Sequence, residues 1–236
     1  MSQESLETIF RPKSIAILGA SRDENKIGGR PLLYLKKYAF GGPIYPVNPN
    51  YPEVQGLKAY KSILDVTGEV DLALIVLPAA AVLQAIGECA EKGVNSVVIF
   101  SSGFAETGDE GNAAQLEMRR IADLAGMRIV GPNCMGIAAF DHNMIITFGV
   151  SMLNMPPVLG PVSIVSQSGA FGSVSYAEAR QRHLGVRLWA TTGNESDVNV
   201  ADCLNYFVED PETKVILMYF EASRDGAKLV AGLEAA

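Results

Sequence analysis

Histidine and cysteine are scarce in this sequence of 236 residues, which has two histidines, His142 and His183, and three cysteines. The cysteines Cys89, Cys134 and Cys203 are widely spaced, as is typical of a reduced cytoplasmic protein and not of a disulfide scaffold. Neither histidine lies in a recognisable pairing with a serine or cysteine nucleophile, so a catalytic triad is not supported. No spacing among these residues matches a set of metal ligands, and we expect no metal site.

An excess of positive charge is also missing. Lys+Arg number 19 and Asp+Glu number 26, so the formal net charge is −7 and sequence-independent nucleic-acid binding is not expected. Local hydrogen-bond donors must hold any anionic ligand, because the global field opposes it. No apolar run reaches the ~20 residues that a membrane helix needs, and no N-terminal segment resembles a signal peptide. We therefore expect a cytoplasmic protein with neither a membrane nor nucleic acid as partner.

The sequence is rich in short apolar runs that alternate with helical patterns. Hydrophobic residues make up 48% of the chain, and 23 glycines cluster after strand-like runs. Strands are expected at 14–19, 43–49, 71–78, 96–103 and 127–134, and helices near 32–38 and at 80–92 and 111–125. This alternation indicates βαβ units and a parallel sheet.

The alternation pauses at 141–161, where three prolines favour a linker. It then restarts with a strand, a glycine turn and a helix in VSIVSQSGAFGSVSYAEARQ. Further strands are expected at 187–193 and 214–221, with helices near 200–209 and at the end of the chain. The second unit is therefore expected to be a smaller α/β domain of three strands.

Ligands of open α/β sheets bind beyond the carboxyl ends of the strands, where two glycine turns stand out. The loop at 19–29 opens a helix and could hold a phosphate, with Arg22, Lys26 and Arg30 as nearby cations. It is not GxGxxG, and the second strand ends in Val47-Asn48-Pro49-Asn50 without the acid that binds the NAD ribose. The loop therefore favours a phosphorylated nucleotide other than NAD. The alternative is a tight turn without a ligand, with its cations solvated.

The second turn, SQSGA at 166–170, offers two hydroxyls and free N–H groups at a helix N-terminus to a phosphoryl group. The alternative is that a serine merely caps the helix. Glu221 closes an apolar strand, where it could orient a base or be a surface charge, and Glu195 is similar. Cys134 could lie beside a thiol substrate or be buried and inert.

The segments SSGFAETG, GPNCMG, VSQSGAFG and TTGNESDVNVADCLNYFVEDPETKVI occur together in this chain. In combination they resemble the CoA-binding and first ligase domains of NDP-forming acyl-CoA synthetases. The similarity is to the ADP-forming acetyl-CoA synthetase type, and more distantly to the succinyl-CoA synthetase α subunit. It implies an α/β protein with a Rossmann-like CoA-binding domain of parallel strands at 1–148 and a linker at 149–161. A smaller, flavodoxin-like ligase domain would follow at 162–236, truncated before the catalytic histidine.

The resemblance also implies roles for residues at the strand ends. In the phosphate loop, the residues implied to bind CoA are Gly19, Ala20, Ser21, Arg22 and Lys26. Further along the CoA molecule, the implied contacts are Pro78 beside adenosine and pantetheine, Ser102 and Gly103 near the pantetheine end, and Asn133 and Cys134 beside the thiol. The implied catalytic residues are Ser166, Ser168 and Gly169, which receive the phosphate of a phosphohistidine, and Glu221, which positions that histidine.

This sequence departs from the family pattern at two points. Relatives commonly have a lysine just beyond the NP of the second strand, but Asn50 and Tyr51 stand there, so CoA binding depends more on Arg22, Lys26 or the backbone. The phosphorylated histidine of the family lies downstream of the stretch that ends in AGLEAA, and neither histidine of this chain matches it. The ATP-grasp part is also expected to lie elsewhere.

The implied function is the CoA-binding portion of an ADP-forming acyl-CoA synthetase, an acid–thiol ligase. Such an enzyme interconverts acyl-CoA, phosphate and ADP with carboxylate, CoA and ATP through an acyl phosphate and a phosphohistidine. ATP or ADP with Mg is expected only on regions or a partner chain absent here, such as an ATP-grasp subunit. We expect this chain to bind CoA and a carboxylic acid or acyl-CoA, without completing turnover alone.

Two other functions are compatible with parts of the pattern. The same two domains also occur fused to protein acetyltransferases, which suggests a non-catalytic CoA- or acyl-CoA-sensing regulatory module. The SQSG turn and Glu221 favour the enzyme, because a pure sensor needs no receptacle for a phosphoryl group. An NAD(P) oxidoreductase is disfavoured by the missing ribose acid.

Overall fold

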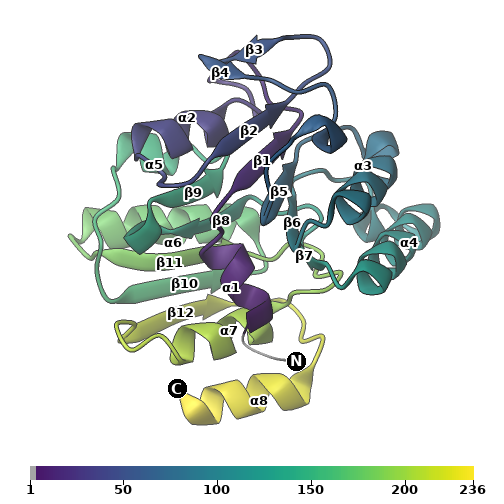
Figure 1. Ribbon diagram of the computed structural model, residues 1–236. Coiled ribbons are helices and arrows are strands. Elements are labelled where there is room, and N and C mark those ends of the chain that lie inside the picture. The colour runs from purple at the N-terminus through teal and green to yellow at the C-terminus, as the bar shows by residue number, and fades with distance from the viewer. Residues whose placement is uncertain (1–3) are drawn as a thin grey trace.

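The first sheet is wholly parallel, as the βαβ pattern predicts. In a computed structural model that describes residues 4–236, its strand order is β2-β1-β5-β6-β7 (Figure 1). The strands are β1 (Ile15–Leu18), β2 (Ile44–Val47), β5 (Leu72–Ile75), β6 (Ser96–Ile99) and β7 (Arg128–Val130). All four strand pairs are parallel, so every strand ends at the same edge of the sheet. The expected α/β fold is confirmed, and residues 1–3 of the expected first domain lie outside the described residues.

Helices cover both faces of this sheet because its strands are apolar on both sides. The burial pattern of β1 and β5 is unbroken, as expected for central parallel strands. On one face, α3 (Ala79–Lys92) and α4 (Asp109–Ala125) contribute side chains such as Ile86 and Met118 to a core with the strands. On the other face lie α1 (Glu4–Phe10) and α2 (Arg30–Lys37) (Figure 1).

The short elements of the first half surround the ends of its strands. They are the hairpin of β3 (Glu53–Val54) and β4 (Leu57–Lys58), and the 3₁₀ turns η1 (Ile63–Asp65) and η2 (Ala105–Thr107). The hairpin follows the second strand and folds back beside the loop at 19–29, which it contacts through Gln55. The sequence pattern did not predict this hairpin, because two-residue strands carry no periodicity.

The second sheet has the order β12-β10-β11-β8-β9 and is mixed. Its parallel part contains the three expected strands, β10 (Val162–Ser166), β11 (Val186–Thr191) and β12 (Val215–Tyr219). The accompanying helices are α6 (Gly169–Gln181), α7 (Val200–Val208) and α8 (Gly226–Ala235). Because β10 lies between β11 and β12, the turn that follows it opens at the centre of the parallel edge.

The expected pause in the alternation at 141–161 is only partly correct. Strands β8 (Gly136–Ala139) and β9 (Met144–Thr147) form an antiparallel hairpin through η3 (Phe140–His142), and β8 pairs with β11. Residues 136–147, expected to close the first domain, therefore belong to the second sheet. A hairpin has no crossover helix, so the βαβ pattern could not reveal it. The short helix α5 (Ser151–Asn154) follows, and the division into 1–148, 149–161 and 162–236 stays a prediction.

One hydrophobic core joins the two sheets. It contains Ile17 and Leu74 of the first sheet together with Ile146, Val165 and Leu188 of the second. Helix α1 adds to this junction, because the Phe10 ring stacks on Tyr206 of α7 with centroids 4.9 Å apart. The two sheets are thus held in one arrangement by apolar packing. Among the described residues, no helix is both long and apolar enough to cross a membrane.

Candidate functional site

The loop at 19–29 makes a close turn that only glycine permits. Gly19 has φ of +88°, and a Cβ atom there would lie 2.1 Å from the carbonyl oxygen of Val76. A Cβ at Gly28 would lie 2.3 Å from the carbonyl oxygen of Gly19. The two ends of the loop therefore touch backbone to backbone, and the N–H of Ser21 donates to the carbonyl of Gly28 at 3.1 Å. This is the compact shape that a phosphate-binding turn requires.

Two amide side chains hold this loop in place. Nδ2 of Asn48 donates to the carbonyl of Ala20 at 2.8 Å, and Nε2 of Gln55 donates to the carbonyls of Ser21 and Gly29, each at 2.9 Å. Asn48 occupies the end of β2, where an NAD-binding protein carries its ribose-binding acid. The residue at this position is thus used to shape the loop.

The three cations predicted near the loop have different surroundings. Arg22 and Lys26 are exposed, and Nε of Arg22 donates to the carbonyl of Glu53 at 3.1 Å. Arg30 is turned inward, where its guanidinium donates to the carbonyls of Phe148 at 2.7 Å and Asn25 at 2.9 Å. Arg22 and Lys26 therefore lie at the surface, where a ligand phosphate can reach them, whereas Arg30 links the loop to the second sheet.

A cavity of about 370 Å³ lies beyond the ends of β1 and β2. Gly19 forms part of its wall, and its polar lining comes from Asn48, Asn50, Lys61, Ser62, Gln84 and Glu88. Lys61 brings an exposed ammonium group to this cavity, although the family lysine after the NP of β2 is missing. The sequence reasoning did not single out Lys61, because it lies ten residues beyond the expected position.

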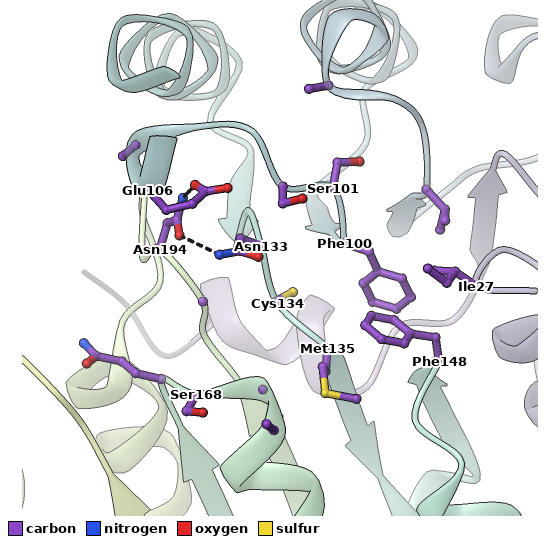
Figure 2. Close-up of a pocket in the computed structure, with 18 of the residues that line it drawn as sticks. Ile27, Phe100, Ser101, Glu106, Asn133, Cys134, Met135, Phe148, Ser168 and Asn194 are labelled. Atoms are coloured by element: carbon purple, nitrogen blue, oxygen red, sulfur yellow. Dashed lines mark hydrogen bonds between the residues drawn. The ribbon is translucent and has the colours of Figure 1, made fainter. Parts of the chain in front are cut away.

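A larger pocket of about 960 Å³ opens where the carboxyl ends of the first sheet meet those of the parallel strands of the second (Figure 2). The predicted residues that line it are Pro78, Ser102, Asn133, Cys134, Ser168, Gly169 and Glu221. Gly103 and Ser166 lie next to the lining without forming part of it, and Ala20, Ser21, Arg22 and Lys26 belong to the phosphate loop. Residues more than 140 positions apart in the chain thus face one space.

The turn after β10 presents the N-terminus of α6 to this pocket. Ser168 caps the helix, because its Oγ accepts from the N–H of Phe171 at 3.3 Å. Ser166 is buried, and its Oγ donates to the carbonyl of Ser168 at 2.7 Å, so it supports the turn from behind. Within residues 4–236, the N–H groups of Gly169 and Ala170 have no hydrogen-bond acceptor. These two donors, at the positive end of a 13-residue helix, suit an anion.

Asn133 connects the two halves of the pocket wall. It adopts φ of +60°, and its Nδ2 donates to Oδ1 of Asn194 at 3.3 Å (Figure 2). Asn194 in turn donates to the carboxylate of Glu106, which also accepts from the N–H of Gly103 at 2.6 Å. Burial raises the pKa of Glu106, but these hydrogen bonds outweigh it and hold that pKa below its ordinary value. Glu106 is therefore a charged acceptor that ties the 101–107 loop to the 193–195 loop.

Cys134 is a buried thiol at the edge of the pocket. It is 2% exposed, and its Sγ donates to the carbonyl of Ile99 at 3.3 Å. Burial raises the pKa of this thiol to about 12, so the thiolate form is negligible near neutral pH. Cys134 can shape the wall beside a ligand, but it is not poised as a nucleophile.

An apolar wall forms the side of the pocket that faces away from Glu106. Figure 2 shows Ile27, Phe100, Met135 and Phe148 along this side, and the Phe100 and Phe148 rings meet edge to face at 5.0 Å between centroids. The sequence reasoning missed these four residues. They come from four separate segments of the chain. In the sequence, an apolar side chain that follows a strand cannot be distinguished from a residue of the hydrophobic core.

Two charged residues of the pocket lie just after the end of β12. Glu221 is exposed there, and of the residues that line this pocket Arg224 is the single cationic one. Gln167, between the two predicted serines, contacts the backbone of Glu221 and Ala222. Sequence reasoning missed Gln167 and Arg224, although Gln167 lies inside the SQSG motif and could have been examined with it.

The histidines do not take part in this arrangement. His142 and His183 are exposed, and neither lines the pocket. Across residues 4–236, no group of three or more His, Cys, Asp or Glu side chains is placed to hold a metal ion.

Comparisons with known proteins agree with this geometry. Residues 13–139 match the model of the CoA binding domain, and residues 159–236 match the succinyl-CoA ligase like flavodoxin domain. The α subunit of acetate–CoA ligase [ADP-forming] II from Pyrococcus furiosus is 42% identical over 95% of this chain and 48% of its own length. Acetate–CoA ligase [ADP-forming] from Methanocaldococcus jannaschii is 40% identical over 93% of this chain and 30% of its own.

Solved structures show the same similarity. Acetyl-coenzyme A synthetase 1 of Ca. Korarchaeum cryptofilum, determined in complex with phosphate and ADP, superposes with a TM-score of 0.86 at 38% identity. The match covers 94% of this chain and 46% of the other. This chain therefore spans about half the length or less of the relatives it matches. It belongs to the family of CoA-binding domains, continues into a succinyl-CoA ligase like flavodoxin domain, and has ADP-forming acetate–CoA ligases as its relatives.

Proposed function

We propose that this chain is the CoA- and phosphate-binding part of an ADP-forming acyl-CoA synthetase. The observation that carries the proposal is the 960 Å³ pocket, where the free N–H groups of Gly169 and Ala170 face the same space as Asn133 and Cys134. A thioester and a phosphate must meet in such a space for acyl transfer. The relatives named as acetate–CoA ligases support the same reading.

In this proposal the CoA molecule extends across both cavities. The 370 Å³ cavity at the ends of β1 and β2 takes the nucleotide end, with Lys61 beside a phosphate. The loop at 19–29 holds the diphosphate with its backbone and with Arg22 and Lys26. The segment Leu77-Pro78-Ala79, which lines the larger pocket, lies along the pantetheine arm and directs the thiol towards Asn133.

The chemistry proposed for the larger pocket is acyl transfer between CoA and phosphate. Phosphate, held by Gly169 and Ala170, attacks the thioester carbonyl, so that an acyl phosphate forms and the CoA thiolate leaves. The helix dipole of α6 and Arg224 stabilise the negative charge that develops on this side of the pocket. Glu221 orients the imidazole that then accepts the phosphoryl group.

The remaining steps need groups that we place outside this chain. The histidine that is phosphorylated, the site for ATP or ADP with Mg, and the ATP-grasp fold would come from further sequence of the same protein or from a partner subunit. We further propose that the protein works in the cytoplasm, where CoA and ADP are available.

Calorimetry on the full chain tests the CoA site. CoA and acetyl-CoA should bind and NAD should not, because no acid is present at the end of β2 to bind its ribose. Lys26→Met should weaken CoA binding, whereas Lys214→Met, an exposed lysine at the start of β12, should leave it unchanged. Binding of NAD with CoA unbound would contradict the proposal.

The phosphate site separates this proposal from a CoA-sensing regulatory module. In amide NMR spectra of the ¹⁵N-labelled chain, inorganic phosphate should shift the signals of Gly169 and Ala170. A pure sensor needs only the CoA contacts, so it would respond to CoA and show no phosphate response at these two amides. That second result would favour the sensor over the enzyme.

A further inference from the structure

The side chain of Gln167, which lines the larger pocket, makes four hydrogen bonds. Its Oε1 accepts from the N–H of Glu221 at 2.6 Å and from the N–H of Ala222 at 3.1 Å. Its Nε2 donates to the carbonyl of Ala222 at 2.7 Å and to Oε2 of Glu195 at 2.7 Å. One side chain therefore joins the end of β12 to the turn after β10 and to the loop after β11.

Glu195 fixes the orientation of this amide. Its Oε1 accepts from the hydroxyl of Thr192 at 2.8 Å and from the N–H of Val200 at 2.9 Å, so Oε2 remains for Gln167. Burial raises the pKa of Glu195, although its hydrogen bonds with Thr192, Gln167 and Val200 act in the opposite direction. Glu195 is 7% exposed and its carboxyl group is held at both oxygens, so it forms a rigid support for Gln167.

Only one orientation of the Gln167 amide satisfies all of its partners. If the amide were turned over, its oxygen would face the Glu195 carboxylate and the Ala222 carbonyl, and its NH₂ would face two N–H donors. The network therefore distinguishes glutamine from glutamate at position 167. It also distinguishes glutamate from glutamine at position 195, because both carboxylate oxygens accept, Oε1 from Val200 and Oε2 from Gln167, and an amide would turn its NH₂ towards the NH₂ of Gln167.

The position of Gln167 gives these bonds a role. It stands between Ser166 and Ser168, two residues before the first free N–H donor of α6, and its side chain reaches the backbone of Glu221 just after the neighbouring strand β12. Gln167, Ser168, Glu221 and Ala222 all line the larger pocket. We propose that Gln167, supported by Glu195, is a positioning residue that holds the Glu221–Ala222 backbone against the phosphate-binding turn. This inference rests on the proposed function, because that function makes the turn a phosphate site.

A response across the network tests the proposal. In the ¹⁵N-labelled full chain, inorganic phosphate should shift the amides of Gly169 and Ala170 directly. It should also shift the amides of Glu221 and Ala222, because Gln167 transmits the change at the turn to these two N–H groups. In Gln167→Ala, the response of Glu221 and Ala222 should fall at least fivefold, while the phosphate affinity read at Gly169 stays within twofold.

Exchanging the two side chains adds a rescue test. Gln167→Glu places a carboxylate against Glu195 and should abolish the response at Glu221 and Ala222. In the double variant Gln167→Glu with Glu195→Gln, an N–H donor again faces an acceptor across the pair, and part of the response should return. Gln181→Ala, at the exposed C-terminal end of α6, is the matched control and should behave as the wild type.

Two different negative results separate the inference from the function on which it rests. If phosphate shifts none of the four amides in the wild type, the phosphate site of the proposed function is wrong. If phosphate shifts all four amides and Gln167→Ala or Gln167→Glu leaves the response at Glu221 and Ala222 intact, the positioning role is wrong. If Gln167→Ala or Gln167→Glu unfolds, the double variant Gln167→Glu with Glu195→Gln still tests the positioning role.

Discussion

The guanidinium carbon of Arg22 lies 3.9 Å from the centre of the Tyr51 ring. Tyr51 follows β2 in the region where the family commonly has a lysine, and Nε of Arg22 is fixed by its bond to the carbonyl of Glu53. Arg22 therefore supplies the positive charge in this region, and the Tyr51 ring holds its guanidinium group in place. A cation over an exposed ring gains about 0.5–1 kcal/mol, enough to restrict a flexible side chain.

Arg22→Met should lower the affinity for CoA about tenfold, because a hydrogen bond to a charged phosphate is worth about 1.5 kcal/mol. Tyr51→Leu keeps the charge and removes the ring that holds it, so the loss should be smaller, about two- to fivefold. Calorimetry with CoA measures both. Arg182→Met, at an exposed position just after α6, is the control, and wild-type affinity in both loop variants would exclude Arg22 from the site.

The cysteines should resist alkylation in the folded chain. Cys89, Cys134 and Cys203 are all buried, and burial raises the pKa of Cys89 and of Cys134 to about 12. Iodoacetamide followed by mass spectrometry should label none of the three at neutral pH within minutes, and all three after unfolding in urea. Rapid labelling of Cys134 in the native protein would contradict the burial of its thiol.

Ser168→Ala should reduce stability by about 1 kcal/mol, because the hydroxyl that caps α6 is lost. Asn199→Ala is a useful comparison, since Oδ1 of Asn199 caps α7 by accepting from Ala201 at 2.9 Å and Asp202 at 3.0 Å. Both variants should unfold at lower urea concentration. Only Ser168→Ala should also weaken the response of Gly169 to phosphate, which separates a ligand contact from a helix cap.

Asp197→Ala should cost about 1.5–3 kcal/mol, because the buried Asp197 carboxylate accepts charge-assisted hydrogen bonds from arginine side chains. Oδ2 of Asp197 accepts from Nε of Arg128 at 2.7 Å, and the Asp197 side chain is 2% exposed. Arg119 approaches the other oxygen. Urea unfolding at pH 7 measures the effect. Glu117→Ala, which breaks an exposed pair with Arg120, should leave stability almost unchanged.

The same carboxylate should make stability depend on acid pH. Burial raises the pKa of Asp197, but the bond and charge of Arg128 outweigh it, so the folded pKa lies below the ordinary value. The stabilisation is then fully present above the unfolded pKa of ~3.9 and is lost as pH falls through the lower folded pKa. Between pH 5 and pH 3 the wild type should lose more stability than Asp197→Ala. Parallel curves for the two proteins would assign the acid sensitivity to other groups.

Much of the fold follows from the order of short apolar runs and helical patterns. The five strands of the first sheet and β10 and β12 of the second lie within the stretches expected from sequence, and β11 begins one residue before its expected range. The hairpin of β8 and β9 was missed, because two fully buried four-residue strands carry no alternation and no α-helix separates them. Pairing between distant strands decides their place, and a local pattern cannot show it.

The sequence allowed candidate site residues to be proposed from their positions at the ends of strands. Gly19, Ser168 and Glu221 follow the ends of strands. Ligands of open α/β sheets bind beyond the carboxyl ends of the strands, so these residues could be proposed from sequence. Arg30 was weighed as a phosphate cation, yet its guanidinium is engaged with two carbonyls. The partners of a long side chain depend on segments 118 residues away, such as Phe148, and only tertiary structure reveals them.

The core that contains Ile17, Leu74, Val165 and Leu188 has a consequence for how the chain unfolds. Separating the halves near residue 148 would expose apolar faces of both sheets, so neither half is expected to melt alone. The chain should therefore lose its structure in a single cooperative transition, observed at the same denaturant concentration by probes in either sheet. Because the two sheets cannot swing apart without breaking that core, the space between their strand ends is already shaped before any ligand arrives.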